Sequence, residues 1–386
     1  MRKKYFVIQL VLLSFVIGAF GCAEETQQDQ VVVPDVLDVS EQLPVPELTS
    51  LASYEFQDST HRPEILFYEN KLYVLVVDHD FQQDISIKHQ GYIYDVSDPL
   101  SIDFDNPDVN FVISKETDEY GSPSDHRVAI VNDELWVVFQ SSIVDEAKRE
   151  ECVGGPLEPC VESQHLMFTR FTLDGEEILT TEIASTTEFP EDNYPDMSVV
   201  ANGDTLLVST GTSDLGLKIR EVDLDGEILN TYEYQTSTDG IPGSIGNSLF
   251  RGEDGNLLVF SGTMNQTSVT VLDENFEAGN ALLFDLPDDE NTFQTGVDYK
   301  DGYYYVGYSA REKGDIAIET NPLSPRMIIL NQDLEVVKTI SISEEAGHGH
   351  VHPSIVFVED YLFYAWSKSE NGKPQVIIEI FEDANS

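Results

Sequence analysis

The feature that most constrains the fold of this chain is a hairpin pattern that recurs six times. Each copy is an apolar strand, a tight turn rich in Asn, Asp and Gly, and a second strand rich in aromatic residues. These turn residues are the ones that short β-hairpins require. The copies occupy residues 62–77, 127–140, 194–210, 246–262, 294–309 and 352–367. Such recurrence predicts an array of like units.

A second, weaker hairpin follows the first in the repeat. It is recognisable at residues 166–183, 217–234, 267–284 and 326–342. Four strands in a repeat of roughly 50 to 70 residues form the unit of a β-propeller. No long stretch of helical periodicity occurs after the N-terminal apolar run. The sequence therefore predicts an all-β, six-bladed β-propeller.

The two ends of the repeat region complement each other. The sixth unit stops after the strand at 374–383 and has only three strands, whereas 45–58 reads as a strand without a partner. A ring of sheets is closed only when its first and last blades are tied together. We therefore expect residues 45–386 to form the propeller, with the N-terminal strand completing the sixth blade.

The chain begins with a secretory signal. Basic residues 2–4 precede an apolar run, and Cys22 follows "AFG". This junction resembles the bacterial lipoprotein box. The resemblance implies that residues 1–21 are a signal peptide, that Cys22 carries lipid such as palmitate, and that the protein is exported and anchored in the cell envelope, at the outer membrane, periplasm or cell surface. An ordinary signal peptide or an uncleaved anchor is the alternative.

Residues 22–44 are acidic, rich in Gln and Pro and poor in aromatics, which predicts a flexible tether. The whole chain has 71 acidic and 21 basic residues, a net charge of −50. This charge excludes nucleic acid as a partner, and excludes contact with an anionic membrane except through the lipid anchor. The acidity lies in ones and twos between strands, as on a solvated surface. A monomer is expected.

Cys152 and Cys160 flank a Gly-Gly-Pro turn. In an exported protein such thiols oxidise, so we expect a disulfide across a long hairpin loop. A zinc pair is the alternative, with His165 the only histidine nearby in sequence.

The leading ends of the inner strands form the mouth of the axial channel, where propellers usually bind ligands. Aligning the six units places one set of residues there: Arg62, Arg127, Tyr194, Gly246, Gln294 and His352. A second set lies two residues further along: Glu64, Ala129, Asp196, Ser248, Gly296 and Ser354. The mouth is therefore the expected ligand-binding site.

His61-Arg62 and His126-Arg127 place two like pairs on neighbouring blades. Two arginines with nearby histidines would form a positive focus in an acidic protein, suited to a carboxylate or sulfate held by guanidinium forks. The alternative is that the arginines pair with Glu64, Asp125 or Asp196, because buried charges must be paired whether or not they have a function. The sequence leaves both open.

His348, His350 and His352 alternate just before the last inner strand. Side chains two apart on an extended chain point the same way, so a divalent metal is one hypothesis. The other is that His352 faces the channel while the remaining two bond to loop backbone or solvent. We expect no cofactor and no metal.

The inner hairpins, "HRPEIL" above all, resemble those of the sialidase-type and related glycoside-hydrolase propellers. In that family the first inner strand carries an arginine of a carboxylate-binding triad beside a proline. The resemblance covers residues 58–381 as architecture and implies that Arg62 matches the first triad arginine, with Arg127 a candidate for the second. The aspartate boxes of the family are absent, and neither the third arginine nor the tyrosine nucleophile is assigned, although Tyr194 is expected at the rim.

Two functions stay open. One is a non-catalytic envelope lipoprotein that binds a glycan, an acidic small molecule or an envelope protein at the mouth, and the absence of a complete catalytic motif favours it. The other is a carbohydrate hydrolase at the same channel, which needs two carboxylates, from Glu64, Asp125 and Asp196. A propeller supports both.

Overall fold

The computed structural model describes residues 44–58, 60–80, 85–115, 122–145, 161–212, 216–234, 246–252, 254–263, 266–284, 290–312, 323–344, 351–370 and 373–384. The predicted signal peptide, Cys22 and nearly all of the tether lie outside these residues, as do Cys152 and Cys160. Within the described ranges, no helix has the length and apolar character needed to cross a membrane. Residues 43–386 belong to one compact unit.

The described residues form six antiparallel sheets of four strands, which we call blades. Blade 1 contains β2 (Thr60–Tyr68), β3 (Lys71–Asp80), β4 (Ile85–Asp95) and β5 (Val109–Lys115), and blade 2 contains β6 (Ser122–Val131), β7 (Glu134–Val144), β8 (Val161–Thr172) and β9 (Glu177–Ser185). Blade 3 contains β10 (Asp192–Asn202), β11 (Thr205–Thr212), β12 (Leu217–Val222) and β13 (Ile228–Tyr234).

The second half of the ring follows the same order. Blade 4 contains β14 (Asn247–Arg251), β15 (Leu257–Thr263), β16 (Gln266–Leu272) and β17 (Leu282–Leu283), and blade 5 contains β18 (Glu290–Lys300), β19 (Tyr303–Glu312), β20 (Ser324–Leu330) and β21 (Val336–Ser341). Blade 6 contains β22 (Ser354–Val358), β23 (Tyr361–Glu370), β24 (Lys373–Asp383) and β1 (Leu48–Asp58). A short 3-10 helix, η1 (Pro99–Ser101), lies between β4 and β5.

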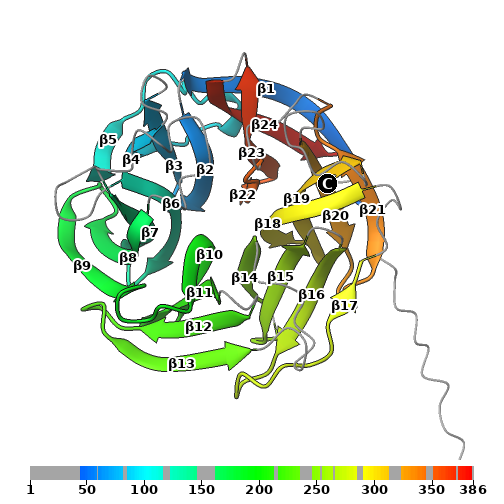
Figure 1. The fold of residues 1–386 in the computed structure, drawn as a ribbon. Coiled ribbons are helices and arrows are strands. Elements are labelled where there is room, and N and C mark those ends of the chain that lie inside the picture. The colour runs from blue at the N-terminus through cyan, green and yellow to red at the C-terminus, as the bar shows by residue number, and fades with distance from the viewer. Residues whose placement is uncertain are drawn as a thin grey trace, which may run out of the picture. The chain divides into compact units, whose positions relative to one another are not determined.

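The blades stand around a central axis, with β2, β6, β10, β14, β18 and β22 innermost (Figure 1). This is the predicted six-bladed β-propeller. Each inner hairpin joins its strands through the turn that the sequence marked, as at Asn132 and Asp133, which both have positive φ. The predicted repeat is therefore the structural unit.

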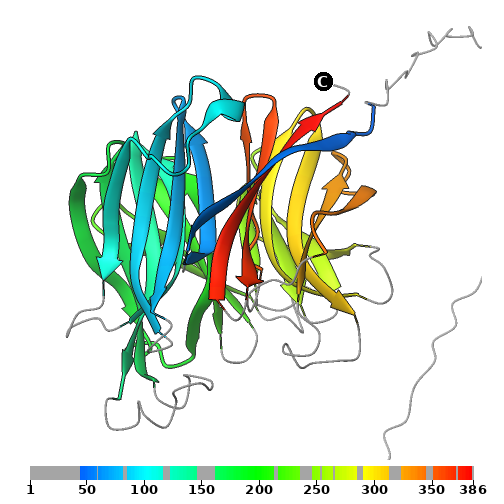
Figure 2. The same cartoon turned by 90° about the horizontal axis from the view of Figure 1, so that it is seen from above.

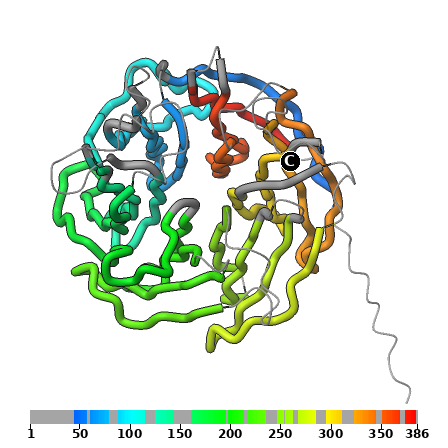
Figure 3. Tube along the Cα trace, in the orientation of Figure 1, coloured from blue at the N-terminus to red at the C-terminus, as the bar shows by residue number. Residues whose placement is uncertain are grey.

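The two ends of the described chain meet in blade 6. The N-terminal strand β1 pairs antiparallel with β24, from Leu48 opposite Asp383 to Asp58 opposite Gln375. Figure 2 shows the blue β1 lying along the red β24, and the traces in Figure 3 lie together in the same way. Blade 6 thus combines the first strand with the last three, which is the arrangement that the unpartnered N-terminal strand predicted.

The hydrophobic core lies between neighbouring blades. One cluster contains Trp136 and Phe168 of blade 2 packed against Met197 and Leu206 of blade 3, all fully or almost fully buried. Similar clusters separate the other blades. Both faces of a blade are covered by neighbouring blades, so the sequences of many strands are nearly continuous runs of apolar residues. The inner strands contribute residues to these clusters and also line the central cavity.

Candidate functional site

A shared central cavity of about 240 Å³ is lined by three or four residues of each blade, and one of these lining positions recurs at the same place in the inner strands. In five blades this position lies four residues before the closing pair of the inner hairpin, as Glu64 does before Tyr68, and in blade 4 it is opposite Phe260. We call the set the inner ring: Glu64, Arg127, Ser198, Ser248, Gly296 and Ser354. No member has an apolar side chain.

The register corrects the sequence alignment in blades 2 and 3. Arg127 is level with Glu64, not with Arg62. In blade 3, Ser198 occupies the position that the alignment gave to Asp196. The alignment started from the residue that opens each strand, and the strands differ in length ahead of their turns: Arg62 lies six residues before Tyr68, whereas Arg127 lies four before Val131. The two arginines therefore lie in successive layers.

The charged members of the mouth pair across blades 1 and 2. Nη1 of Arg62 lies 2.5 Å from Oδ2 of Asp125, and Nη1 of Arg127 lies 3.8 Å from Oε2 of Glu64. The side chain of Asp125 is 1% exposed and that of Arg127 is 9% exposed. We call these four residues the mouth cluster. Their charges balance, so the structure has the paired arrangement and not a positive focus.

The pKa of Glu64 differs from that of an ordinary carboxyl group. Burial raises the pKa, and the nearby Asp125 raises it further, while Arg127 and a hydrogen bond with Ser354 lower it in part. The net effect is a raised pKa. Asp125, by contrast, has a guanidinium in direct contact. The two carboxyl groups of the cluster therefore differ in their electrostatic environment.

The backbone at the mouth adopts an unusual conformation. Arg62 and His352 have φ of 53° and 49°, and Gly246 at the corresponding place in blade 4 has φ of 66°. The left-handed region costs a residue with a side chain about 1–2 kcal/mol. At Arg62 the backbone N–H donates to Oγ of Ser367 in β23, which holds this conformation. Such strain occurs often at functional sites.

The predicted histidines are buried and do not form an open cationic rim. His352 is 5% exposed, His61 is 8% exposed and His126 is fully buried. The ring of His126 packs 5.0 Å from that of His89, and burial followed by the charge of His89 holds the pKa of His126 well below its usual range. His126 is therefore neutral at physiological pH.

Tyr194 does not lie at the rim. It is completely buried in the cluster between blades 2 and 3, and its hydroxyl donates to Oδ2 of Asp192. Burial raises the pKa of this phenol above its usual range. The expectation that Tyr194 lies at the rim is wrong, whereas its contact with a ligand stays a prediction from sequence. The side chains of Asp196 and Gln294 lie outside the described residues, whereas Ala129 lines the cavity.

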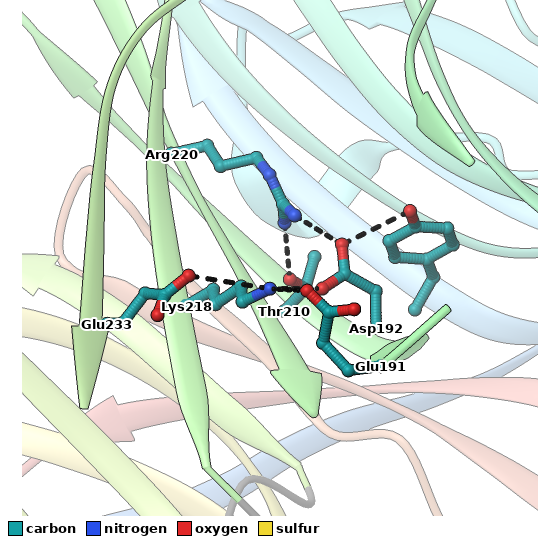
Figure 4. A network of polar contacts seen from close by, with 7 residues as sticks. Glu191, Asp192, Thr210, Lys218, Arg220 and Glu233 are labelled. Carbon is teal, nitrogen blue, oxygen red and sulfur yellow. Dashed lines mark hydrogen bonds and ion pairs between the residues drawn. The ribbon is translucent and has the colours of Figure 1, made fainter. Parts of the chain in front are cut away.

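A buried charged network in blade 3 was not predicted (Figure 4). Asp192 accepts a bond of 2.8 Å from Nζ of Lys218 and a second, short bond from Arg220. Arg220 also donates to Oγ1 of Thr210 at 2.9 Å. The ring of Phe189 lies 5.2 Å from the Arg220 guanidinium. We call this the blade 3 network; its sequence signal is the charged pair within the apolar strand "LKIREV".

The remaining ring members join neighbouring inner strands. Oγ of Ser354 accepts from the backbone N–H of Ile65 at 3.0 Å, and Oγ of Ser198 accepts from that of Leu249 at 2.8 Å. Ser248 donates to the carbonyl of Thr295. Gly296 is required because a Cβ there would clash with the carbonyl of Pro353. These residues satisfy the inner edges of the blades.

In the described part of the chain, no group of three or more His, Cys, Asp or Glu side chains is arranged to hold a metal ion. His348 and His350, which the metal hypothesis needs, are not among the described residues. That hypothesis stays a prediction from sequence.

No family model and no curated protein matches the chain. Solved structures do match. A mutant of Trypanosoma rangeli sialidase displaying trans-sialidase activity is 11% identical, with a TM-score of 0.52 over 86% of this chain and 59% of that one. Phage phi92 endosialidase is 11% identical, with a TM-score of 0.54 over 88% of this chain and 69% of that one.

This chain spans about three-fifths of the length of the sialidase chain. The likeness shows a common fold, the six-bladed propeller of sialidase type, at an identity too low to carry function. Arg62 and Arg127, which the resemblance matched to a carboxylate-binding triad, each hold a carboxylate of this protein. Their role therefore has to be argued from the site itself.

Proposed function

We propose that this protein is an exported, lipid-anchored envelope protein whose propeller binds a glycan at the mouth of the axial channel without cleaving it. The mouth cluster is the observation that carries the proposal. It brings the carboxyl group of Glu64 and the guanidinium of Arg127 to the cavity that the six inner strands share, and the Arg62–Asp125 pair lies close to Glu64. These groups are the hydrogen-bonding partners that sugar hydroxyls need.

The propeller fold does not itself demand this cluster. The other four ring positions join adjacent blades with serine hydroxyls or a close glycine contact. A buried ion pair is often no more stabilising than apolar residues of the same volume, because both charges lose their hydration. Two such pairs at adjacent blades, beside the strained backbone of Arg62, are better explained by a ligand than by stability.

The proposal is tested by binding to an array of immobilised oligosaccharides. We expect the wild type to bind, and the double variant Glu64→Gln/Arg127→Met to lose at least about ten-fold in affinity, the size of one lost charged hydrogen bond. The double change removes both charges together, so neither residue is left as a buried charge without its partner.

A matched control is available in the same blade as Arg127. Glu134 and Arg170 form an ion pair of 2.7 Å with 23% and 14% exposed side chains, away from the cavity. Glu134→Gln/Arg170→Met should alter stability and leave glycan binding unchanged. The proposal is contradicted if both double variants lose binding equally. It is also contradicted if the wild type binds no glycan on the array.

A second candidate is hydrolysis of a glycan at the same site. The raised pKa of Glu64 beside Asp125, which contacts Arg62, favours it, since two carboxyl groups in unlike environments are the basis of glycosidase acid and base roles. Release of new reducing ends from an array glycan by the wild type, and not by Glu64→Gln, would establish this function in place of simple binding.

The lipid anchor is tested separately. Cells supplied with a fatty-acid probe should label the wild type and not Cys22→Ala. Equal labelling of the two proteins would contradict the anchor and leave glycan binding untouched.

A further inference from the structure

We infer that the mouth cluster selects an uncharged, hydroxyl-rich glycan and discriminates against carboxylated sugars. This inference rests on the proposed function, since it names the ligand class of the same site. It is opposite to what two arginines at a channel mouth lead one to expect.

Each guanidinium of the mouth cluster already holds a carboxylate of the protein itself. Asp125 is 1% exposed and contacts Arg62 at 2.5 Å, so it cannot retreat into solvent when a ligand arrives. A carboxylated ligand would have to share Arg62 with a buried negative charge. Like charges brought together away from water repel strongly. The same holds for Arg127 with Glu64.

The paired groups of the mouth cluster can form hydrogen bonds with a sugar hydroxyl. A sugar hydroxyl both donates and accepts, so it fits between a carboxylate oxygen and a guanidinium N–H without disturbing their pairing. Within the described part of the chain, Nε of Arg62 is buried and has no hydrogen-bond acceptor. The same residue has a positive φ, and its backbone N–H donates to Ser367. A neutral oxygen supplied by a ligand satisfies it at no electrostatic cost.

The rest of the protein is strongly acidic. Its net charge of −50 disfavours the approach of anions, and the mouth cluster adds no net positive charge to offset this. The serines of the inner ring on blades 3, 4 and 6 add only neutral groups. An anionic ligand therefore meets repulsion at long range and competition at short range.

The experiment uses oligosaccharides in matched pairs, one neutral and one carrying a uronic or sialic acid on the same backbone. We expect the full-length protein to bind the neutral member at least about ten-fold more tightly, a difference of about 1.4 kcal/mol. Preference for the carboxylated members overturns this inference and leaves the proposed function standing. Binding of neither member overturns the proposed function, and the inference with it.

A variant sharpens the test. Asp125→Asn releases Arg62 from its carboxylate, so the preference for neutral sugars should fall by about ten-fold or reverse. Glu64→Gln should act in the same direction through Arg127, and serves if the first variant does not fold. The control is Glu134→Gln, which removes a carboxylate from Arg170 in blade 2, outside the residues that line the cavity. An unchanged preference in both mouth variants, or an equal change in the control, overturns the inference.

Discussion

The mouth cluster and the blade 3 network both bury charged groups at the leading ends of strands, but they are built differently. In the blade 3 network one acid, Asp192, is shared by Lys218 and Arg220, and all three belong to one blade. Arg220 is also bonded to Thr210 and covered by Phe189. In the mouth cluster each pair joins two blades, and the Glu64–Arg127 pair lines a cavity.

This difference separates a structural network from a candidate binding site. In the blade 3 network the charged groups bond to one another. Removing one member therefore leaves the others in a low-dielectric interior without that partner. In the mouth cluster, Nε of Arg62 is buried and has no acceptor among the described residues, although the Arg62 side chain as a whole is 24% exposed. A buried polar network whose donors and acceptors are all paired is expected to be structural. A buried donor without an acceptor, close to a cavity, instead suggests a ligand.

The largest expected effect comes from Asp192→Asn. This change keeps the shape of the side chain but leaves Lys218 and Arg220 buried without their shared charge, and should cost about 3–5 kcal/mol in the free energy of unfolding. Urea denaturation measures it. A cost below about 1 kcal/mol, the range of exposed pairs, would mean that the network is not structural.

Asp125→Asn should cost less, about 1–3 kcal/mol, even though Asp125 is as buried as Asp192. The reason is that its partner Arg62 is partly exposed and can be solvated when the carboxylate is lost. The same urea titration applies. A loss equal to that of Asp192→Asn would remove the distinction between the two regions.

Arg127→Met should give a pH-dependent loss. Arg127 lowers the pKa of Glu64, which burial has raised above 4.5, so the variant raises it further. An acid with a raised folded-state pKa favours folding below its unfolded pKa and loses this advantage as pH rises. The variant should therefore match the wild type near pH 4 and be less stable at pH 8, by about 1.4 kcal/mol for each unit of added pKa shift. A loss independent of pH would contradict the pairing of Arg127 with Glu64.

Ser354→Ala should have the smallest effect, about 0.5–1.5 kcal/mol, because it removes only uncharged-donor hydrogen bonds, one with the N–H of Ile65 and one with Glu64, at an edge that water can reach through the cavity. Glycan affinity should change little. A loss of binding as large as that of the charged pairs would extend the site around the whole ring.

The sequence was sufficient for the architecture but not for the register at the mouth. Six hairpins with Asn, Asp and Gly turns, and the unpaired strand at 45–58, specify the blades and the pairing of β1 with β24. The inner strands differ in length ahead of their turns, so an alignment on the strand openings misplaced Arg127 and Asp196. The pairing also shifts between His61 and Glu64 and between Asn193 and Ser198, which the alignment did not identify.

That missing register decided which site predictions failed. With Arg62 and Arg127 assigned to one layer, both the positive focus and internal pairing were open, and only the offset of the two layers shows Glu64 opposite Arg127. Lys218 and Arg220 were missed because alternating charges on a strand ordinarily indicate a solvent face. Here the partner Asp192 lies in another strand, a contact that periodicity cannot reveal.

The most direct test of the central claim is hydrogen–deuterium exchange of the full-length protein with and without the neutral oligosaccharide that binds most tightly. The account predicts slower exchange in the leading halves of β2, β6 and β22, around Arg62, Asp125 and His352, with no change in β13 or β17. Unchanged exchange at these inner strands, with protection confined to outer strands, would show that the mouth cluster is not the glycan site.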